Sequence, residues 1–416
     1  MPIDPKPEDL QPSDAAQVAD VLAWAAAGKK TVELVGAGSK SALGRPVETD
    51  YRLHLSALEG VNLYEPEELV LRAGAGTPLG QIQAMLAQQN QQLAFEPPDF
   101  GELYGHAREQ TIGGVLAANL AGPRRIKAGA ARDHFLGLEA VSGRGAAFKS
   151  GGRVVKNVTG YDLCKLMAGS FGTLAALTEV TVKVLPAPEK IRTVLLFGQD
   201  DRAAIAAMSQ AACSPHEVSA LTHLPKAIAA RSAVGYVNGA GRAVTAVRVE
   251  GPAPSVVHRA EALRRLWGGK GNMEELHAHN SNTLWREVGN VASLLPDADA
   301  VIWKLSVTPS MGSEVMAAAL VTGGAGYYDW AGGLLWLALP VGNDSGDGGG
   351  DGGAGLVRAS LGGDGHATLM RGGVELRRRV DVFQPTAAPL AALSARIKAS
   401  FDPHGILNPG RMHGTY

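Results

Sequence analysis

The sequence predicts an α+β protein in two successive domains, with the boundary at about residue 188. In the first domain short strands and helices alternate closely along the chain, a pattern typical of mixed folds. Beyond Ile191, strand–helix–strand units recur in a way that favours an antiparallel sheet, and Pro186 and Pro188 separate the two regions. Glycine supplies 53 of the 416 residues, nearly twice its usual share of about 7%. Such an excess indicates many tight turns and close backbone approaches.

The composition excludes several classes of protein. Lys and Arg number 39 against 40 Asp and Glu, so the chain lacks the basic surplus that nucleic-acid binding requires. Two cysteines, Cys164 and Cys213, cannot build a disulfide framework or supply the four thiolates of a usual iron–sulfur cluster. The acidic, proline-rich N-terminus is no signal peptide, and no apolar run is long enough to span a membrane. We therefore expect a cytoplasmic protein.

Local signals predict the elements of the first domain. Ser13 or Asp14 is a helix N-cap, and apolar residues at helical spacing follow until Gly28 ends the helix. Pro78 favours the first turn of a second helix, which runs to Leu86. Runs of apolar and β-branched residues predict strands at residues 31–35, 51–58, 69–73, 136–141 and 174–185.

The same signals predict the elements of the second domain. Apolar spacing favours helices at residues 202–213, 255–267, 310–320 and 389–400. Strand patterns occur at residues 193–197, 219–221, 243–249, 302–307 and 333–339. Residues 342–355 are rich in Gly and Asp, so we expect a flexible surface loop that buries nothing.

A glycine turn directly follows the first predicted strand. A turn of this kind exposes successive backbone N–H groups on one concave side and forms an anion-binding nest. It is not a P-loop, because a single residue separates Gly36 from Gly38, and it is not a nicotinamide fingerprint, because Ser41 stands where the third glycine belongs. The sequence therefore favours either a pyrophosphate-binding loop or a purely structural turn.

Two further segments are rich in small residues. Residues 110–122 contain consecutive glycines followed by alanines, which suits either a flat ligand near the backbone or a tightly packed helix N-terminus. Residues 158–163 and 169–174 place Ser, Thr and Gly around a helix and the strand that follows it, and taken alone they indicate only turns.

Taken together, the order and spacing of these segments resemble the flavin-binding domain of the vanillyl-alcohol oxidase family, also called the p-cresol methylhydroxylase (PCMH) fold. The resemblance implies a two-lobed PCMH-type FAD-binding domain at residues 1–188 and an antiparallel α+β cap at 189–390. A C-terminal helix and tail at 391–416 would return to the first domain. The strand that follows Phe171-Gly172 would run beside the flavin ring. The FAD-binding residues that it implies are Gly36, Ala37, Gly38, Ser39, Lys40, Ser41, Pro98, Thr111, Gly113, Gly114, Ala117, Asn119, Gly122, Gly172 and Val180.

Within that family, other segments resemble the FAD-binding subunits of bacterial glycolate oxidase. They are residues 132–137, 156–162, 365–369 and the tail 402–410. This implies oxidation of a small 2-hydroxy acid, glycolate, to glyoxylate, in a complex with a second flavin subunit and an iron–sulfur subunit that takes the electrons. Two alternatives remain open: a noncatalytic FAD-carrying subunit beside a catalytic sister chain, and a stand-alone oxidase that reduces dioxygen.

Departures from the family restrict what can be carried over. Covalent members attach the flavin through a His in or beside the pyrophosphate loop, where this chain has Ser39, so the resemblance implies noncovalent FAD; His106 and His134 are nearby alternatives. Residues 362–369 keep one Asp and one His of a His-x-Gly-Asp-Gly-Asn-x-His motif. We therefore expect no metal, and His366 is the candidate catalytic residue or else a structural one.

Two groups of side chains remain ambiguous at this stage. The basic run at residues 124–127 suits a cover over the diphosphate, a partner-facing surface or a solvated loop. The tryptophans Trp285, Trp330 and Trp336 suit either the core of the second domain or an interface.

Overall fold

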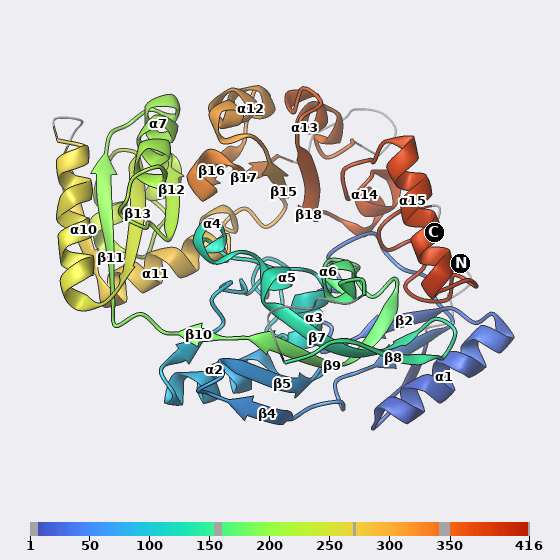
Figure 1. Cartoon of the computed structure of the whole chain (residues 1–416). Coiled ribbons are helices and arrows are strands. Elements are labelled where there is room, and N and C mark those ends of the chain that lie inside the picture. Colours follow the sequence, from blue (N-terminus) through green and yellow to red (C-terminus); the bar gives the residue numbers. More distant parts are fainter. Residues whose placement is uncertain (1–6, 154–159, 269–271, 341–349, 415–416) are drawn as a thin grey trace.

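A computed structural model describes residues 7–153, 160–268, 272–340 and 350–414. Figure 1 shows an N-terminal part that carries two small sheets, below a larger sheet whose helices lie on its outer side. We call the larger sheet and its helices the cap. Mixed helices and antiparallel sheets make this an α+β fold, as the sequence predicts.

The first lobe of the N-terminal part is a parallel sheet covered by one helix. Its strand order is β1 (Glu8–Leu10), β3 (Tyr51–His54), β2 (Val32–Val35), and α1 (Ala15–Gly28) packs on it. Asp14 is the N-cap and accepts a hydrogen bond from the N–H of Gln17, as the sequence predicts. The C-terminal tail joins this lobe, because Leu407 forms a parallel bridge with Val32.

The second lobe is a five-stranded antiparallel sheet. Its order is β4 (Val61–Glu65), β5 (Val70–Gly74), β9 (Ala175–Lys183), β7 (Phe135–Ser142), β8 (Ala147–Gly151). The helices that share its core are α2 (Leu79–Gln88), α3 (Ile112–Ala117), α5 (Ala131–His134) and α6 (Leu163–Met167). A short ladder of β6 (Gln91–Gln92) with β10 (Leu185–Pro186) lies beside it. The sequence patterns missed β4 and β8, which are short and have few buried residues.

The cap is one eight-stranded sheet in which every neighbouring pair is antiparallel. Its order is β14 (Met273–His277), β11 (Lys190–Phe197), β13 (Val244–Gly251), β12 (Ala220–Leu224), β16 (Ala325–Asp329), β17 (Leu334–Leu339), β15 (Val301–Ser306), β18 (His366–Arg371). The outer face packs against α7 (Asp201–Ala212), α10 (Ala253–Leu266), α12 (Gly312–Ala319) and α13 (Ala354–Ser360). The inner face shares a core with α8 (Lys226–Ala229), α9 (Gly235–Asn238), α11 (Ala278–Gly289) and the second lobe. Sequence patterns missed β14, β16, α8, α9 and α11.

One long helix near the C-terminus, α15 (Ala388–Phe401), and several short elements complete the described chain. The short elements are α4 (Arg125–Ala128), α14 (Val374–Arg379) and the 3-10 turns at Ala292–Leu294, Pro309–Met311 and Trp330–Gly332. None of the helices in the described ranges is long and apolar enough to cross a membrane.

The Gly/Asp-rich stretch ends earlier than the sequence suggests. Residues 342–349 lie outside the described residues, but Ala354 is buried and opens α13. The carbonyl of Gly352 accepts a hydrogen bond of 2.8 Å from Nε1 of Trp303. The prediction that the whole stretch buries nothing is therefore wrong for its last residues, because packing against the cap supplies contacts that the local composition does not indicate.

A buried ionic network joins the cap to the second lobe. Glu96 and Arg124 belong to the N-terminal part, and Arg248 and Glu250 lie on β13 of the cap. Arg124 pairs with Glu250 at 2.6 Å and is only 6% exposed. Arg124 is therefore neither solvated nor a cover for a diphosphate, so two of the three readings of the basic run do not hold for it. The network instead fixes how the cap sits over the N-terminal part.

Candidate FAD-binding site

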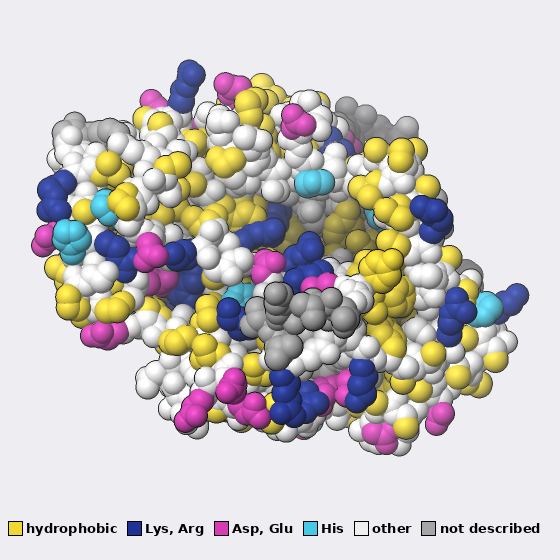
Figure 2. All heavy atoms as spheres, in the orientation of Figure 1, with side chains coloured by type: hydrophobic (Ala, Val, Ile, Leu, Met, Phe, Trp, Pro, Cys, Tyr) yellow, Lys and Arg dark blue, Asp and Glu magenta, His cyan; other side chains and the backbone are white. Residues whose placement is uncertain are grey.

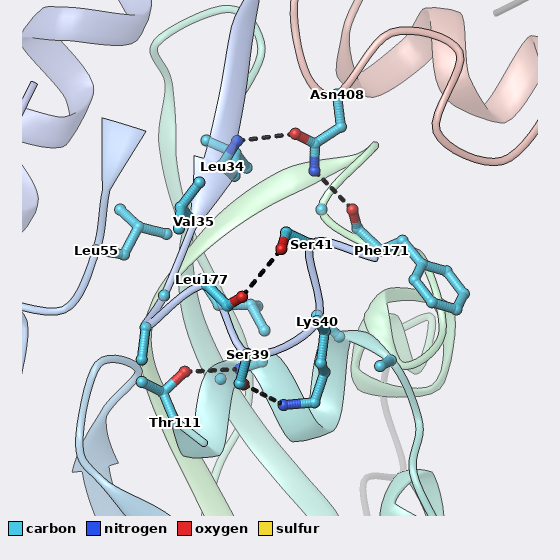
Figure 3. Close-up of a pocket in the computed structure, with 18 of the residues that line it drawn as sticks. Leu34, Val35, Ser39, Lys40, Ser41, Leu55, Thr111, Phe171, Leu177 and Asn408 are labelled. Carbon is cyan, nitrogen blue, oxygen red and sulfur yellow. Dashed lines mark hydrogen bonds between the residues drawn. The ribbon is translucent and has the colours of Figure 1, made fainter. Parts of the chain in front are cut away.

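The pyrophosphate loop predicted at residues 36–41 follows β2 and turns back over it (Figure 3). Gly38 has a φ of 73°, and Oγ of Ser41 donates to its carbonyl at 3.1 Å. Among the described residues, none accepts a hydrogen bond from the backbone N–H groups of residues 36–40. A row of unpaired donors in a curved segment is an anion-binding nest.

The glycines of the site are required by protein packing. A Cβ on Gly36 would lie 2.5 Å from Oγ1 of Thr111, and a Cβ on Gly113 would lie 2.7 Å from Cβ of Ala75. Thr111 is the N-cap of α3 and accepts from the N–H of Gly114 at 3.3 Å. The loop and the start of α3 therefore approach each other closely because side chains are absent, and both line one pocket.

Lys40 is the cation of this pocket. Its Nζ donates to Oγ of Ser39 at 3.2 Å (Figure 3), and no described carboxylate forms an ion pair with it. Burial lowers the pKa of Lys40 to about 7, and the distant Asp99 offsets this only in part. A bound phosphate would supply the missing negative charge and favour the protonated amine.

The C-terminal tail closes the other side of the pocket. Oδ1 of Asn408 accepts from the N–H of Leu34 at 2.8 Å, and its Nδ2 donates to the carbonyl of Phe171 at 2.7 Å (Figure 3). Gly172 has a φ of 70°, and a Cβ there would lie 2.7 Å from Nδ2 of Asn408. Arg411 donates to the carbonyl of Ser41 at 3.0 Å and so anchors the end of the loop.

The pocket gathers most of the predicted FAD-binding residues. Those that line it are Gly36, Ala37, Gly38, Ser39, Lys40, Ser41, Thr111, Gly113, Gly114, Ala117 and Gly172. Apolar side chains that were not predicted complete the walls: Leu34, Val35, Leu43, Leu55, Ala75, Ala118, Phe171, Ala175 and Leu177. Asn408 and Arg411 were also missed as site residues, although Asn408 belongs to the tail motif that the sequence had already singled out.

Four predicted residues do not line this pocket. Val180 is fully buried in β9, and the carbonyl of Pro98 accepts from Gln110 at 2.8 Å beside a separate groove. Asn119 accepts from the N–H of Arg132 at 3.0 Å, and the carbonyl of Gly122 accepts from Nε1 of Trp330 at 3.2 Å. Their contact with the cofactor stays a prediction.

The histidines lie apart from the loop's donor surface. Nε2 of His106 lies 3.1 Å from the carbonyl of Ser39, and Nε2 of His134 lies 2.8 Å from that of Ala128. His366 is exposed at the start of β18, opposite Ser306. Within the described ranges, no three His, Cys, Asp or Glu side chains group as a metal site would require.

These features fit an FAD molecule. The nest and Lys40 suit the two negative charges of a pyrophosphate, and the apolar walls suit a flat ring system. Gly36 and Gly113 bring the two sides of the pocket close together. The fit rests on the backbone N–H donors of residues 36–40, on Lys40 without an ion-pair partner among the described residues, and on the close approach of the loop to the start of α3.

Comparison with known proteins agrees with this fit. A family model described as an FAD binding domain matches residues 9–151. The chain is 32% identical to glycolate oxidase subunit GlcE of Escherichia coli over 388 residues, which covers 92% of this chain and 93% of that one. It is 42% identical to glycolate oxidase subunit GlcD of Bacillus subtilis over 111 residues, 26% of this chain and 23% of that one. It is 34% identical to a D-lactate dehydrogenase of Archaeoglobus fulgidus over 42% of this chain and 38% of that one.

Solved structures share the fold at low sequence identity. A 4-ethylphenol oxidase from Gulosibacter chungangensis superposes with a TM-score of 0.71 at 14% identity, over 97% of this chain and 88% of that one. An alkyldihydroxyacetonephosphate synthase superposes with a TM-score of 0.67 at 14% identity, over 96% and 76%. The likeness spans both the N-terminal part and the cap.

Proposed function

The chain belongs to the family of PCMH-type FAD-binding subunits of glycolate oxidase, and from this premise we propose that it works within a glycolate-oxidising complex that passes electrons to an iron–sulfur partner. The observation that carries the proposal is the 32% identity to GlcE over nearly the full length of both chains. The pocket of residues 36–41 and Lys40 supports it, because it is the part of the chain that suits FAD. When bound, FAD supplies the acceptor for a hydride from the hydroxyl-bearing carbon of the substrate.

The residues of this chain hold and orient the cofactor. The backbone N–H groups of residues 36–40 and the amine of Lys40 bind the pyrophosphate, and the N-cap of α3 at Thr111 fixes the loop against the second lobe. Asn408 holds the tail against Leu34 and Phe171, so that wall of the pocket keeps its shape. With Ser39 in place of a histidine, the flavin is held without a covalent bond.

Electrons must leave through another molecule. Cys164 and Cys213 cannot hold a cluster alone, and Cys164 is buried whereas Cys213 is exposed. The similarity to GlcD covers 111 residues, 26% of this chain. It supports a second flavin subunit as a partner. A cytoplasmic location with peripheral contact to the inner membrane, through such partners, belongs to the same proposal.

Turnover by the isolated chain tests the proposal. The purified chain, reconstituted with FAD, is mixed with glycolate, with and without co-expressed partner subunits. Dye reduction is measured under anaerobic conditions, and dioxygen consumption is measured in air-saturated buffer. We expect negligible turnover alone and turnover with the partners, and the partners without this chain serve as the control. Full turnover by the chain alone would identify a self-sufficient oxidase, and full turnover by the partners without it would reduce this chain to an accessory FAD carrier.

A further inference from the structure

The inner face of the cap carries polar side chains where a sheet face over a core would be apolar. Along β15, Trp303 and Leu305 point to the outer helices and are fully buried. The alternate residues Lys304 and Ser306 point inward and keep contact with solvent. Thr368 and His366 of β18 lie directly opposite them, so the four side chains share one face. At this end of the sheet the inner face is therefore not fully covered by the N-terminal part.

Figure 2 shows a hollow between the cap and the N-terminal part, with Lys and Arg side chains gathered inside it. Two cations of the chain meet at one indole ring. The guanidinium of Arg125, on α4, lies 4.6 Å from the ring centroid of Trp330, and Nζ of Lys304 lies 5.3 Å from it. Nζ of Lys304 also lies 5.6 Å from the ring centroid of Trp336. One cation comes from α4 of the N-terminal part and the other from β15 of the cap.

Neither cation has an anionic partner in the described part of the chain. No side-chain hydrogen bond or ion pair joins Arg125 or Lys304 to another described residue. The nearby carboxylates are engaged elsewhere, since Asp133 accepts from the N–H of Ala130 and Asp329 accepts from that of Trp330, both at 2.8 Å. Burial and the positive charge of Arg125 lower the pKa of Lys304 to about 8, and burial raises the pKa of Asp329 to about 7. Asp133 and Asp329 attract Arg125 and Lys304 through space without forming an ion pair with them. Two positive charges that lack an ion-pair partner favour an anionic ligand.

The backbone beneath this pair is strained. Trp330 and Ala331 have φ values of 49° and 59°, in the left-handed region that costs about 1–2 kcal/mol per non-glycine residue. Nε1 of Trp330 donates to the carbonyl of Gly122 at 3.2 Å, which ties the strained turn to the segment predicted to line the flavin. Strain held by surrounding contacts is typical of ligand-binding positions. The turn thus places the indole, and the cations over it, at the edge of the predicted flavin-lining segment.

We propose that Lys304 and Arg125 bind the carboxylate of the small 2-hydroxy acid, with Trp330 as the platform that holds both cations. The inference rests on the proposed function for the identity of the substrate. The carboxylate supplies the ion-pair partner that the two cations lack. The hydroxyl-bearing end of the same acid is left free to face the flavin domain. Thr368 lies opposite Lys304, and His366 lies opposite Ser306 on the same face. Both side chains are therefore placed to contact the rest of the ligand.

Ligand titration of the FAD-loaded chain tests the site. Glycolate and oxalate are titrated under anaerobic conditions by calorimetry, with ethylene glycol as the uncharged probe. We compare wild type with Lys304→Met and Arg125→Met, which keep an unbranched apolar stem and remove the charge, and with Lys304→Arg, which keeps the charge. Lys127→Met is the matched control. Lys127 lies on α4, as Arg125 does, but it pairs with Glu217 at 3.1 Å. FAD content and thermal melting confirm that each variant is folded.

We expect both Met variants to weaken glycolate and oxalate binding by about tenfold or more. Lys304→Arg and Lys127→Met should stay within about threefold of wild type, and ethylene glycol should not bind measurably. Equal carboxylate affinity in all variants, or no carboxylate binding by wild type, would overturn the site. Carboxylate binding that depends on Lys304, together with no glycolate turnover when the partner subunits are co-expressed, would uphold the site and count against the proposed function.

A second measurement on the wild-type protein tests the site even if a variant fails to fold. Reductive methylation of wild type, read by mass spectrometry of the peptide that contains Lys304, should be slowed severalfold by saturating oxalate. Labelling of Lys127 should be unchanged under the same conditions. Unprotected Lys304 in the presence of oxalate would contradict the proposal.

Discussion

Arg248 donates two hydrogen bonds to the carboxylate of Glu96, at 2.9 and 2.8 Å, across the junction between the cap and the N-terminal part. Arg248 is 1% exposed, and its guanidinium lies 4.9 Å from the ring centroid of Trp285. The coulombic attraction of Glu96 and Glu250 keeps the pKa of Arg248 above its ordinary value despite burial. This pair is one of the contacts that hold the cap above the predicted flavin.

Glu96→Gln should destabilise the protein, because it leaves the buried guanidinium of Arg248 without its bidentate partner. We expect the free energy of unfolding to fall by about 2–3 kcal/mol, below the usual range for a fully buried pair because the Glu96 side chain is 25% exposed. Urea unfolding of the FAD-loaded protein measures it. Glu217 is 65% exposed and pairs with Lys127 at 3.1 Å and with Arg259 at 3.7 Å, so Glu217→Gln should change stability by less than about 1 kcal/mol. Equal losses in the two variants would argue against a clamp at Glu96.

Gly38→Val should abolish FAD retention. The structure changes the reason for this prediction, because the φ of 73° is unfavourable for a β-branched residue and the new Cβ would lie 2.9 Å from Nη1 of Arg108, not in the space of a phosphate. The loop would rearrange and lose its nest. The flavin absorbance of the purified protein measures the effect.

Gly105→Val is the matched control, with a φ of 71° and nothing within 4 Å of the added Cβ. It carries similar backbone strain outside the pocket, so its FAD content should stay near that of wild type. Normal FAD content in Gly38→Val would place the pyrophosphate elsewhere.

FAD affinity should fall as the pH rises above about 7. Lys40 has a pKa of about 7 without a ligand, and an adjacent pyrophosphate would raise this pKa, so binding takes up a proton. Below pH 7 the amine is charged in both states and the affinity is flat. Above pH 7 the affinity should drop by up to tenfold per pH unit, as measured by fluorescence titration of the FAD-free chain.

Lys40→Met should bind FAD more weakly and lose this dependence on pH. Lys30→Met, which removes an exposed amine 3.7 Å from Asp50, should behave as wild type does. A pH profile that keeps its slope in Lys40→Met would assign the titrating group to another residue.

Acid precipitation of the protein should release all of its flavin into the supernatant, because Ser39 cannot form the ring linkage that a histidine forms. The measurement is the flavin fluorescence of the pellet against that of the supernatant. Fluorescence retained by the pellet would mean covalent attachment. His106 would then be the first residue to examine, since its ring lies 3.1 Å from the carbonyl of Ser39.

Features encoded in contiguous residues were predictable from the sequence. The strand that ends at Val35, the turn through Gly38 and the helix capped by Thr111 each depend on the conformational preferences of a few neighbours. The residues that the resemblance named in the loop and at the start of α3 line one pocket, and their contact with FAD stays a prediction. The segment order also indicated the family, which the similarity to GlcE confirms.

The tertiary structure alone decided which distant residues meet. Asn408 contacts Phe171 across 237 residues. Arg124 pairs with Glu250 across 126 residues, so the first residue of a basic run that local sequence left with three readings lies in a buried ion pair. Lys304 was the single charge in an apolar strand, a signal that sequence reasoning passed over, and its proximity to Arg125 depends on how the cap sits. Backbone preference acts over a few residues, whereas the burial of a charge and the absence of its counter-ion are properties of packing between segments far apart in the chain.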